Sequence, residues 1–171
     1  MPDLFKINNP KKVFSATKLF IESIGFGVID HDFDRPWGGY FVINEKQSYT
    51  FIEHFFPEQN ADEFEGYSKL SPKILLVAPG KRLSWQYHHR RAEIWKVIEG
   101  EAGIIRSQTN EQGEIETFSE GEFIQLKQGE RHRLVGLTGW AAIAEIWKHT
   151  DPDNPSDEND IVRLLDDFGR K

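Results

Sequence analysis

The chain has 171 residues, 38% of them hydrophobic, which suits one domain that buries about two thirds of its unfolded surface. Its 21 basic residues against 28 acidic residues leave a net charge of −7, which argues against nucleic-acid binding because that function relies on basic surface. The absence of cysteine excludes disulfides, thiolate catalysis and cysteine-ligated metals. No apolar run is long enough for a membrane helix, and Met1–Val13 lacks a signal-peptide core. We therefore expect a cytoplasmic protein with no membrane or nucleic-acid partner.

The first expected element is a helix over about Pro10–Ile24. Asn9 followed by Pro10 is typical of a helix start, since asparagine caps the first turn and proline lacks an N–H that the first turn would leave unpaired. Apolar residues then recur at helical spacing until Gly25 ends the pattern. We expect this amphipathic helix to cover one face of the main body.

Beyond Gly25, short apolar stretches alternate with turn residues, and this spacing indicates an antiparallel sandwich or closed barrel. The expected strands are Gly39–Ile43, Thr50–Phe56, Ile74–Ala78, Ile94–Glu99, Gly103–Arg106, Ile115–Phe118, Phe123–Leu126, Arg133–Gly136 and Ala141–Trp147. The more polar segment Glu45–Ser71 is expected to leave the barrel. The acidic segment Asp151–Ser156 is expected to link the barrel to a short helix near Asp160–Asp167.

Two blocks of the sequence carry candidate metal ligands. Gln86 and His88 are two positions apart, so on a strand their side chains point to the same face. Glu93 begins the next apolar strand, and His132 follows the turn at Gly129. Nitrogen and oxygen donors of these types suit a borderline or hard divalent ion, and two histidines with one glutamate approach the facial triad that leaves positions open for substrate.

The spacing of these residues resembles the two motifs of the cupin superfamily. Residues 80–100 fit G-x5-H-x-H-x4-E-x6-G, with Gln86 where the first histidine usually stands. Residues 121–132 fit G-x5-P-x-G-x2-H, with Lys127 in the proline position. The resemblance implies a single jelly-roll β-barrel domain, residues 31–171. The helix predicted above from its spacing places an N-terminal helical segment, residues 1–30, before this domain. The metal ligands that it implies are Gln86, His88, Glu93 and His132.

Three further stretches resemble the type II mannose-6-phosphate isomerases: Gln86–Trp95, Arg35–Gly38 and Asp160–Arg170. This resemblance implies an enzyme that interconverts mannose 6-phosphate and fructose 6-phosphate. Its metal would polarise sugar oxygens and stabilise the enediolate. Arg91 takes the position of an active-site arginine and is the predicted catalytic residue. The cations predicted to bind the phosphate are Lys81, Arg82, Arg163 and Arg170.

Several properties stay open at this point. Zinc is the favoured metal, but manganese, iron, nickel and cobalt accept the same ligands. The general base is not identified. Alternative functions are a non-catalytic sugar or sugar-phosphate-binding cupin, an isomerase of a heptose or pentose phosphate, and an iron dioxygenase. Edge strands in small barrels commonly pair, so we expect a homodimer. The histidines given no role in the site are His31, His54, His89 and His149.

Overall fold

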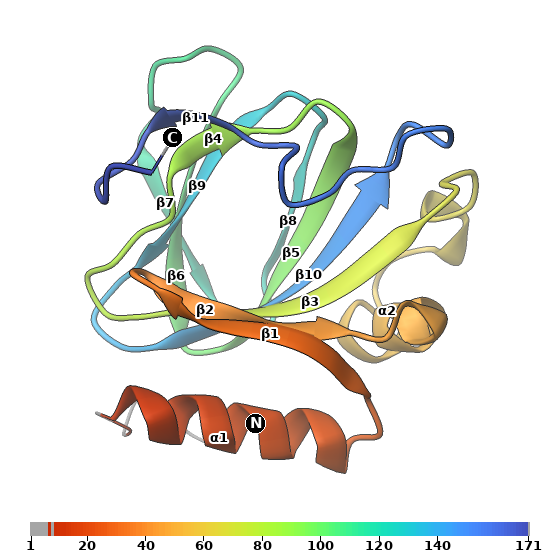
Figure 1. Ribbon diagram of the computed structural model, residues 1–171, viewed down its shortest axis with the longest axis horizontal. Helices are drawn as coiled ribbons and strands as arrows, with labels where there is room; N and C mark the ends of the chain where they lie inside the picture. Colours follow the sequence, from red (N-terminus) through yellow and green to blue (C-terminus); the bar gives the residue numbers. More distant parts are fainter. Residues whose placement is uncertain (1–6, 8, 171) are drawn as a thin grey trace.

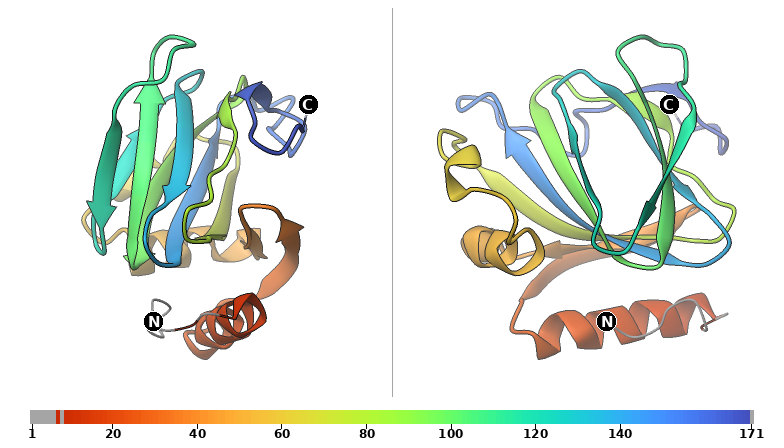
Figure 2. Two further views of the ribbon diagram at one scale, coloured as in Figure 1. Left: turned by 90° about the vertical axis from the view of Figure 1, so that its left-hand side faces the viewer. Right: turned by 180° about the vertical axis from the view of Figure 1, so that it is seen from behind.

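The chain folds into two antiparallel sheets that pack face to face, with helices against the outer side of one sheet (Figures 1 and 2). The computed structural model describes Ile7 and residues 9–170. Residues 1–6 and 8 of the predicted segment 1–30, and residue 171, lie outside the described part of the chain. The helices are α1 (Pro10–Ser23) and α2 (Ser48–Phe55), with short 3-10 turns η2 (Glu45–Gln47) and η3 (Ala61–Glu63). The strands are β1 (Val28–Arg35), β2 (Gly38–Ile43), β3 (Leu70–Val77), β4 (Trp85–Tyr87), β5 (Arg91–Glu99), β6 (Glu101–Ser107), β7 (Ile115–Ser119), β8 (Phe123–Leu126), β9 (Arg131–Gly136), β10 (Ala141–His149) and β11 (Val162–Leu165).

The strand order confirms the predicted jelly roll. One sheet has the order β1-β2-β3-β10-β5-β8, and the other has the order β11-β4-β9-β6-β7. Within the described residues no strand pairing joins the two sheets, so the molecule is an open sandwich and not a barrel closed by hydrogen bonds. Gly100 makes the tight β5–β6 hairpin with a φ of 76°, a backbone conformation that favours glycine.

The helix α1 confirms the predicted helix over about Pro10–Ile24. Asn9 caps α1 by accepting a hydrogen bond from the Lys12 N–H, and Pro10 opens the first turn. The strand β1, which begins at Val28, was not predicted. Its sequence VIDHDFDR is rich in acidic residues because β1 is an edge strand with mostly exposed or half-buried side chains.

The predicted strand Thr50–Phe56 is wrong, since this segment forms the helix α2. Phe51, Ile52 and Phe55 are its buried apolar residues, and a spacing of one and four positions places them on one helical face. Both α2 and the two 3-10 turns fall within the segment Glu45–Ser71, which was expected to leave the barrel. It does so up to Lys69, after which Leu70 and Ser71 begin β3.

The predicted helix near Asp160–Asp167 is also wrong, because Val162–Leu165 forms the strand β11. It pairs with β4, placing Arg163 opposite Gln86. A partner strand about 75 residues earlier in the chain supplies these main-chain hydrogen bonds, and local propensity does not reveal such a partner.

Alternating side chains of the six-stranded sheet define its two faces. On β10, Ala142, Ala144 and Ile146 pack into the apolar cluster beneath α1 and α2. Ala141 and Ile143 instead pack between the sheets, on what we call the inner face. By the same alternation, β3 and β5 each send every second side chain to the inner face. In the part of the chain that the structure describes, neither helix combines the length and the apolarity needed to cross a membrane.

Candidate metal centre and its pocket

The inner face changes from apolar to charged along each of its central strands. On β10, Ala141 and Ile143 are followed two residues later by Glu145. On β5, Val97 and Trp95 lie in the apolar cluster, whereas Glu93, two residues before Trp95, lies on the same face. The C-terminal segment crosses the end of the sandwich at which β5 begins and β10 ends (Figure 1). Since Glu93 is near the start of β5 and Glu145 comes after the apolar residues of β10, the charged part of the inner face lies toward this end. This arrangement gathers ionisable groups inside the sandwich.

Three of the predicted ligands meet at this end. His88 follows β4, Glu93 lies on β5 and His132 lies on β9, and one ligand atom from each lies within 4.8 Å of the others. The His88 Nε2 atom is 3.3 Å from Glu93 Oε1, and the His132 Nε2 atom is 3.5 Å from Glu93 Oε2. All three side chains are buried, with 2% of each residue exposed.

Two main-chain carbonyls set the tautomer of both histidines. His88 Nδ1 lies 2.5 Å from the carbonyl oxygen of Asp160, and His132 Nδ1 lies 2.9 Å from that of Glu130. A carbonyl oxygen only accepts, so each Nδ1 carries the proton and each Nε2 presents a lone pair. Burial lowers the pKa of His88 to about 3 and also lowers the pKa of His132, so both rings are neutral at pH 7.

These lone pairs face an ionised carboxylate. Burial opposes the ionisation of Glu93, but the adjacent guanidinium of Arg91 helps to hold the pKa of its carboxyl below its usual range. Glu93 Oε2 and His132 Nε2 are buried and have no hydrogen-bond partner among the described residues. Acceptors that face one another at such distances repel unless a cation lies between them. The two imidazoles and the carboxylate therefore fit a divalent metal ion.

Gln86 lies beside these three residues but does not turn its oxygen toward them. It is directly opposite His132 across the β4–β9 pair, and its Nε2 is 3.4 Å from His88 Nε2. Its Oε1 accepts a hydrogen bond of 2.5 Å from the Ser84 hydroxyl. Coordination by Gln86 would require its amide to turn over, with Ser84 then accepting from it.

Arg91, the predicted catalytic residue, is buried against the ligands. Its Nε donates to Glu93 Oε1 at 2.6 Å, and its Nη2 lies 3.1 Å from His88 Nε2. Its guanidinium carbon is 3.5 Å from the centre of the Trp147 ring, an arrangement that favours a cation. The structure thus brings together the predicted ligands and the predicted catalytic arginine.

A pocket opens next to these residues, and two of the four predicted phosphate-binding cations line it. Arg163 and Arg170 lie in its wall, whereas Lys81 and Arg82 are exposed and lie outside it. Arg82 instead forms an ion pair with Asp167. Burial first, and next the positive charge of Arg170, lower the pKa of Arg163, which shows that two guanidiniums lie near each other here. Such a concentration of positive charge suits an anion.

The pocket wall also contains four charged residues to which sequence reasoning gave no role. They are Arg35, Lys73, Glu145 and Glu158. Lys73 and Glu145 are each buried within a largely apolar strand, and a buried charge in such a run is an available signal for a functional residue. Arg35 belongs to a motif noted in the sequence, but the motif alone does not place it in a pocket.

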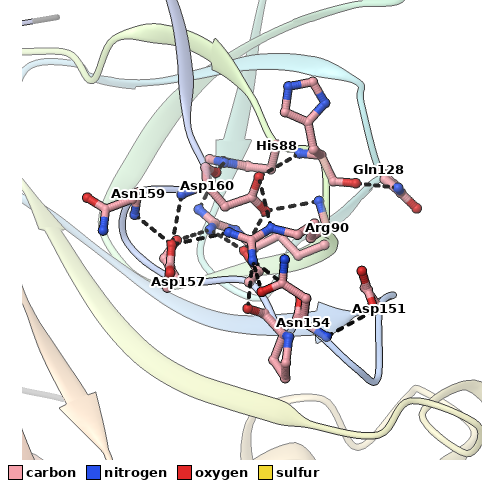
Figure 3. A network of polar contacts seen from close by, with 12 residues as sticks. His88, Arg90, Gln128, Asp151, Asn154, Asp157, Asn159 and Asp160 are labelled. Atoms are coloured by element: carbon pink, nitrogen blue, oxygen red, sulfur yellow. Dashed lines mark hydrogen bonds and ion pairs between the residues drawn. The ribbon is translucent and has the colours of Figure 1, made fainter.

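The C-terminal segment is tied to the loop that holds His88 (Figure 3). The carboxylate of Asp160 accepts hydrogen bonds from the main-chain N–H groups of His89 and Arg90, at 3.0 and 2.9 Å. Arg90 also donates to the side-chain oxygen of Asn154 at 2.6 Å. We call residues 151–160 the tail strap, because they hold the loop beside the metal ligands from outside the sheets.

Comparison with protein families gives one match that covers most of the chain. The family described as mannose-6-phosphate isomerase C-terminal matches residues 50–166. Among curated relatives, the xanthan biosynthesis protein XanB of Xanthomonas campestris and the mannose-1-phosphate guanylyltransferase ManC of Salmonella typhimurium are each 29% identical over 136 residues. The match covers 80% of this chain but only 23% and 22% of those proteins, so the chain corresponds to less than a quarter of their length.

Comparison with solved structures shows the fold. A variant of the Bacillus subtilis oxalate decarboxylase OxdC aligns with a TM-score of 0.53 and 15% identity, covering 79% of this chain and 30% of that one. The capsular polysaccharide assembling protein CapF of Staphylococcus aureus also aligns with a TM-score of 0.53, at 16% identity, covering 79% of this chain and 34% of that one. Both likenesses support the cupin architecture, and at this identity they carry no conclusion about activity.

Proposed function

Because this chain belongs to the mannose-6-phosphate isomerase C-terminal family, we propose that it is a metal-dependent isomerase that interconverts mannose 6-phosphate and fructose 6-phosphate. The observation that carries the proposal is the buried group of His88, Glu93 and His132, whose facing acceptor atoms call for a cation. This group lies beside a pocket with several cationic residues in its wall.

The conversion of an aldose into a ketose moves a hydrogen from C2 to C1 and a proton from O2 to O1. A divalent metal at this site would polarise the sugar oxygens at C1 and C2 and lower the energy of the enediolate. Zinc is our first choice, with manganese, iron, nickel and cobalt as alternatives. Arg91 donates to Glu93 and lies within hydrogen-bond distance of His88, and its Nη1 donates to Ser156 and Asp157. One N–H of its Nη2 is left to stabilise a developing negative charge on the sugar oxygens.

The phosphate of the substrate would bind at the arginines of the pocket wall. Arg163 lies opposite Gln86 in the β11–β4 pair, which places it in the same row of the sheet as the metal site. Arg170 and Arg35 line the same pocket. A phosphate dianion offsets the mutual repulsion of these guanidiniums, and their planar groups bind phosphate through paired hydrogen bonds.

The test is a coupled assay in which purified protein receives mannose 6-phosphate and fructose 6-phosphate is detected. We expect turnover that stops with a chelator and returns when zinc or another divalent metal is added back. His132→Ala should abolish it, whereas His89→Ala, a neighbouring histidine with an exposed ring, should retain it.

Two results would contradict the proposal. Folded, metal-loaded protein without turnover, yet binding the sugar phosphate, would favour a binding module. Metal-dependent turnover of a heptose or pentose phosphate, without turnover of mannose 6-phosphate, would support an isomerase but show that the proposed substrate is wrong.

A further inference from the structure

The proposed reaction needs a group that carries a proton between two carbons, and the ligand set leaves this role unfilled. Three carboxylates line the pocket: Glu93, Glu145 and Glu158. Glu93 faces both histidines and Arg91, so its oxygens belong to the metal site. Glu158 is more than half exposed and forms an ion pair with Lys73. Glu145 is the remaining carboxyl.

Glu145 lies in the middle of the inner face. Its position on β10 is directly opposite Lys73 on β3 and Trp95 on β5. Side chains opposite each other across antiparallel strands point to the same face, so Lys73, Glu145 and Trp95 form a row inside the sandwich. Trp95 follows Glu93 by two residues on β5. The carboxyl of Glu145 is therefore one row away from the metal ligand.

The contacts of Glu145 hold it in place and leave one oxygen available. Its Oε1 accepts a hydrogen bond of 2.9 Å from the indole N–H of Trp95. Its Oε2 accepts no hydrogen bond from the described part of the chain, and this atom is not fully buried. Only 4% of Glu145 is exposed, and the residue lines the pocket. Its Oε2 atom therefore faces the pocket and is shielded from bulk solvent.

We propose that Glu145 is the acid–base residue of the proposed isomerase and that it carries the proton between C2 and C1 of the open-chain sugar. This inference rests on the function proposed above. Its carboxylate takes the C2 proton; the C–H electron pair becomes the C1=C2 bond, and the carbonyl pair moves to O1. The O2 proton then passes to O1, the electron pair left on O2 forms C2=O, and the C1=C2 pair takes the proton from Glu145 to C1. Glu145 ends the cycle ionised as it began.

The surroundings of Glu145 suit this exchange. Burial first, and next the negative charge of Glu93, raise the pKa of Glu145 to about 8, against the lowering effects of Lys73, Arg91 and the Trp95 hydrogen bond. A carboxyl that titrates near neutral pH both accepts and returns a proton readily. Lys73, itself held over the Trp147 ring at 3.6 Å, provides a positive charge that steadies the ionised form.

The test compares wild type, Glu145→Gln, Glu145→Asp and the control Glu116→Gln, which changes an exposed residue of the other sheet. Zinc-loaded protein is incubated with mannose 6-phosphate in D2O, and NMR follows fructose 6-phosphate and deuterium at C1 and C2. We expect Glu145→Gln to lower kcat at least about 100-fold and to stop deuterium incorporation. Its zinc content and its thermal shift with mannose 6-phosphate should remain those of wild type, and Glu145→Asp should recover part of kcat.

The two proposals fail in different ways. If the wild type is active and the kcat of Glu145→Gln lies within tenfold of the wild-type kcat, the proposed role of Glu145 is overturned and the proposed function stands. Loss of zinc in Glu145→Gln, with turnover lost in proportion, would assign Glu145 a structural role and overturn the inference as well. An inactive, zinc-loaded wild type would overturn the proposed function, and the role of Glu145 with it.

Discussion

The Nδ1 atom of His88 lies 2.5 Å from the carbonyl oxygen of Asp160, a residue 72 positions later in the chain. This hydrogen bond fixes both the tautomer and the orientation of a proposed metal ligand, and its acceptor lies outside the strands that carry the other proposed ligands. The side chain of Asp160 in turn holds the main chain at His89 and Arg90. The orientation of His88 therefore depends on the tail strap.

Replacement of Asp160 should weaken both the fold and the metal site. Asp160→Ala removes the acceptor of two main-chain N–H groups and of the Ser156 hydroxyl, so we expect a loss of about 2–3 kcal/mol in the free energy of unfolding. The carbonyl of residue 160 that orients His88 remains in this variant, but the side chain no longer ties it to the loop at His89 and Arg90. Zinc affinity should therefore fall about 10–100-fold. Denaturant titration and competition with a zinc chelator measure these effects. Asp153→Ala, an exposed change in the same tail strap, is the control, and equal zinc affinity in both variants would refute the argument.

Removal of the metal should destabilise the protein. Without a cation, the lone pair of His132 faces the carboxylate of Glu93 in a buried site. A bound metal present at 100 times its Kd adds about 2.7 kcal/mol to the free energy of unfolding, so we expect a chelator to lower the Tm of zinc-loaded protein by several degrees. The Tm of His132→Ala should not respond to chelator or zinc. Scanning calorimetry measures this, and a wild-type Tm that ignores both would contradict a metal site.

The arginines of the pocket should determine affinity for the phosphate. Arg163→Gln removes a positive charge from the pocket wall, so we expect KM for the phosphosugar to rise about tenfold or more while kcat changes less. Lys81→Gln removes a positive charge outside the pocket and is the matched control, expected to leave KM unchanged. Steady-state kinetics at several salt concentrations separate a specific contact from general attraction. Equal effects of the two variants would place the phosphate elsewhere.

Stability should fall on acidification because of a buried histidine outside the metal site. His149 is 1% exposed, and its Nε2 lies 2.9 Å from the Ser71 hydroxyl. Burial first, and next the charge of Lys69, lower the pKa of His149 to about 4, below the value near 6.5 of an unfolded histidine. The folded state therefore binds fewer protons. Its stabilisation is complete above about pH 6.5 and is lost as the pH falls toward 4, by up to about 3 kcal/mol.

The comparison of wild type with His149→Gln isolates this effect, because other titrating groups are common to both proteins. Urea denaturation at intervals from pH 8 to pH 4 should show a smaller loss of stability in the variant. The measurements at pH 8 are the internal control, since His149 is neutral there in both states. Parallel curves for the two proteins over the whole range would show that His149 does not contribute.

The ligand set could be predicted from the sequence because its spacing is set by local structure. Gln86 and His88 are two positions apart in extended chain, so their side chains point to the same face, and Glu93 follows across a short turn. The positions of these three residues in the chain therefore nearly determine how their side chains lie relative to one another. His132 required the second motif, since its neighbour across the sheet, Gln86, is distant in sequence. The known spacing of the two cupin motifs thus indicated which residues, distant in sequence, lie close together in the fold.

The remaining features depend on pairings that no local pattern records. Glu145 and Lys73 meet only because β10 pairs with β3 in one register, and a shift by one residue would turn one of them to the other face. Arg163 enters the pocket only because Val162–Leu165 pairs with β4 in place of the expected helix. The orientation of the Gln86 amide was likewise beyond the sequence, since it depends on Ser84.

The placement of Arg163 after the tail strap has a thermodynamic consequence. Arg163, which lines the pocket, follows Asp160, which orients His88, by three positions. An anion that binds Arg163 and a cation that binds His88 both favour the state in which residues 160–163 are docked. Each should therefore tighten the binding of the other by the same factor, since a coupling free energy is reciprocal. Under the proposed function, metal and phosphosugar would each act as an allosteric effector of the other's binding.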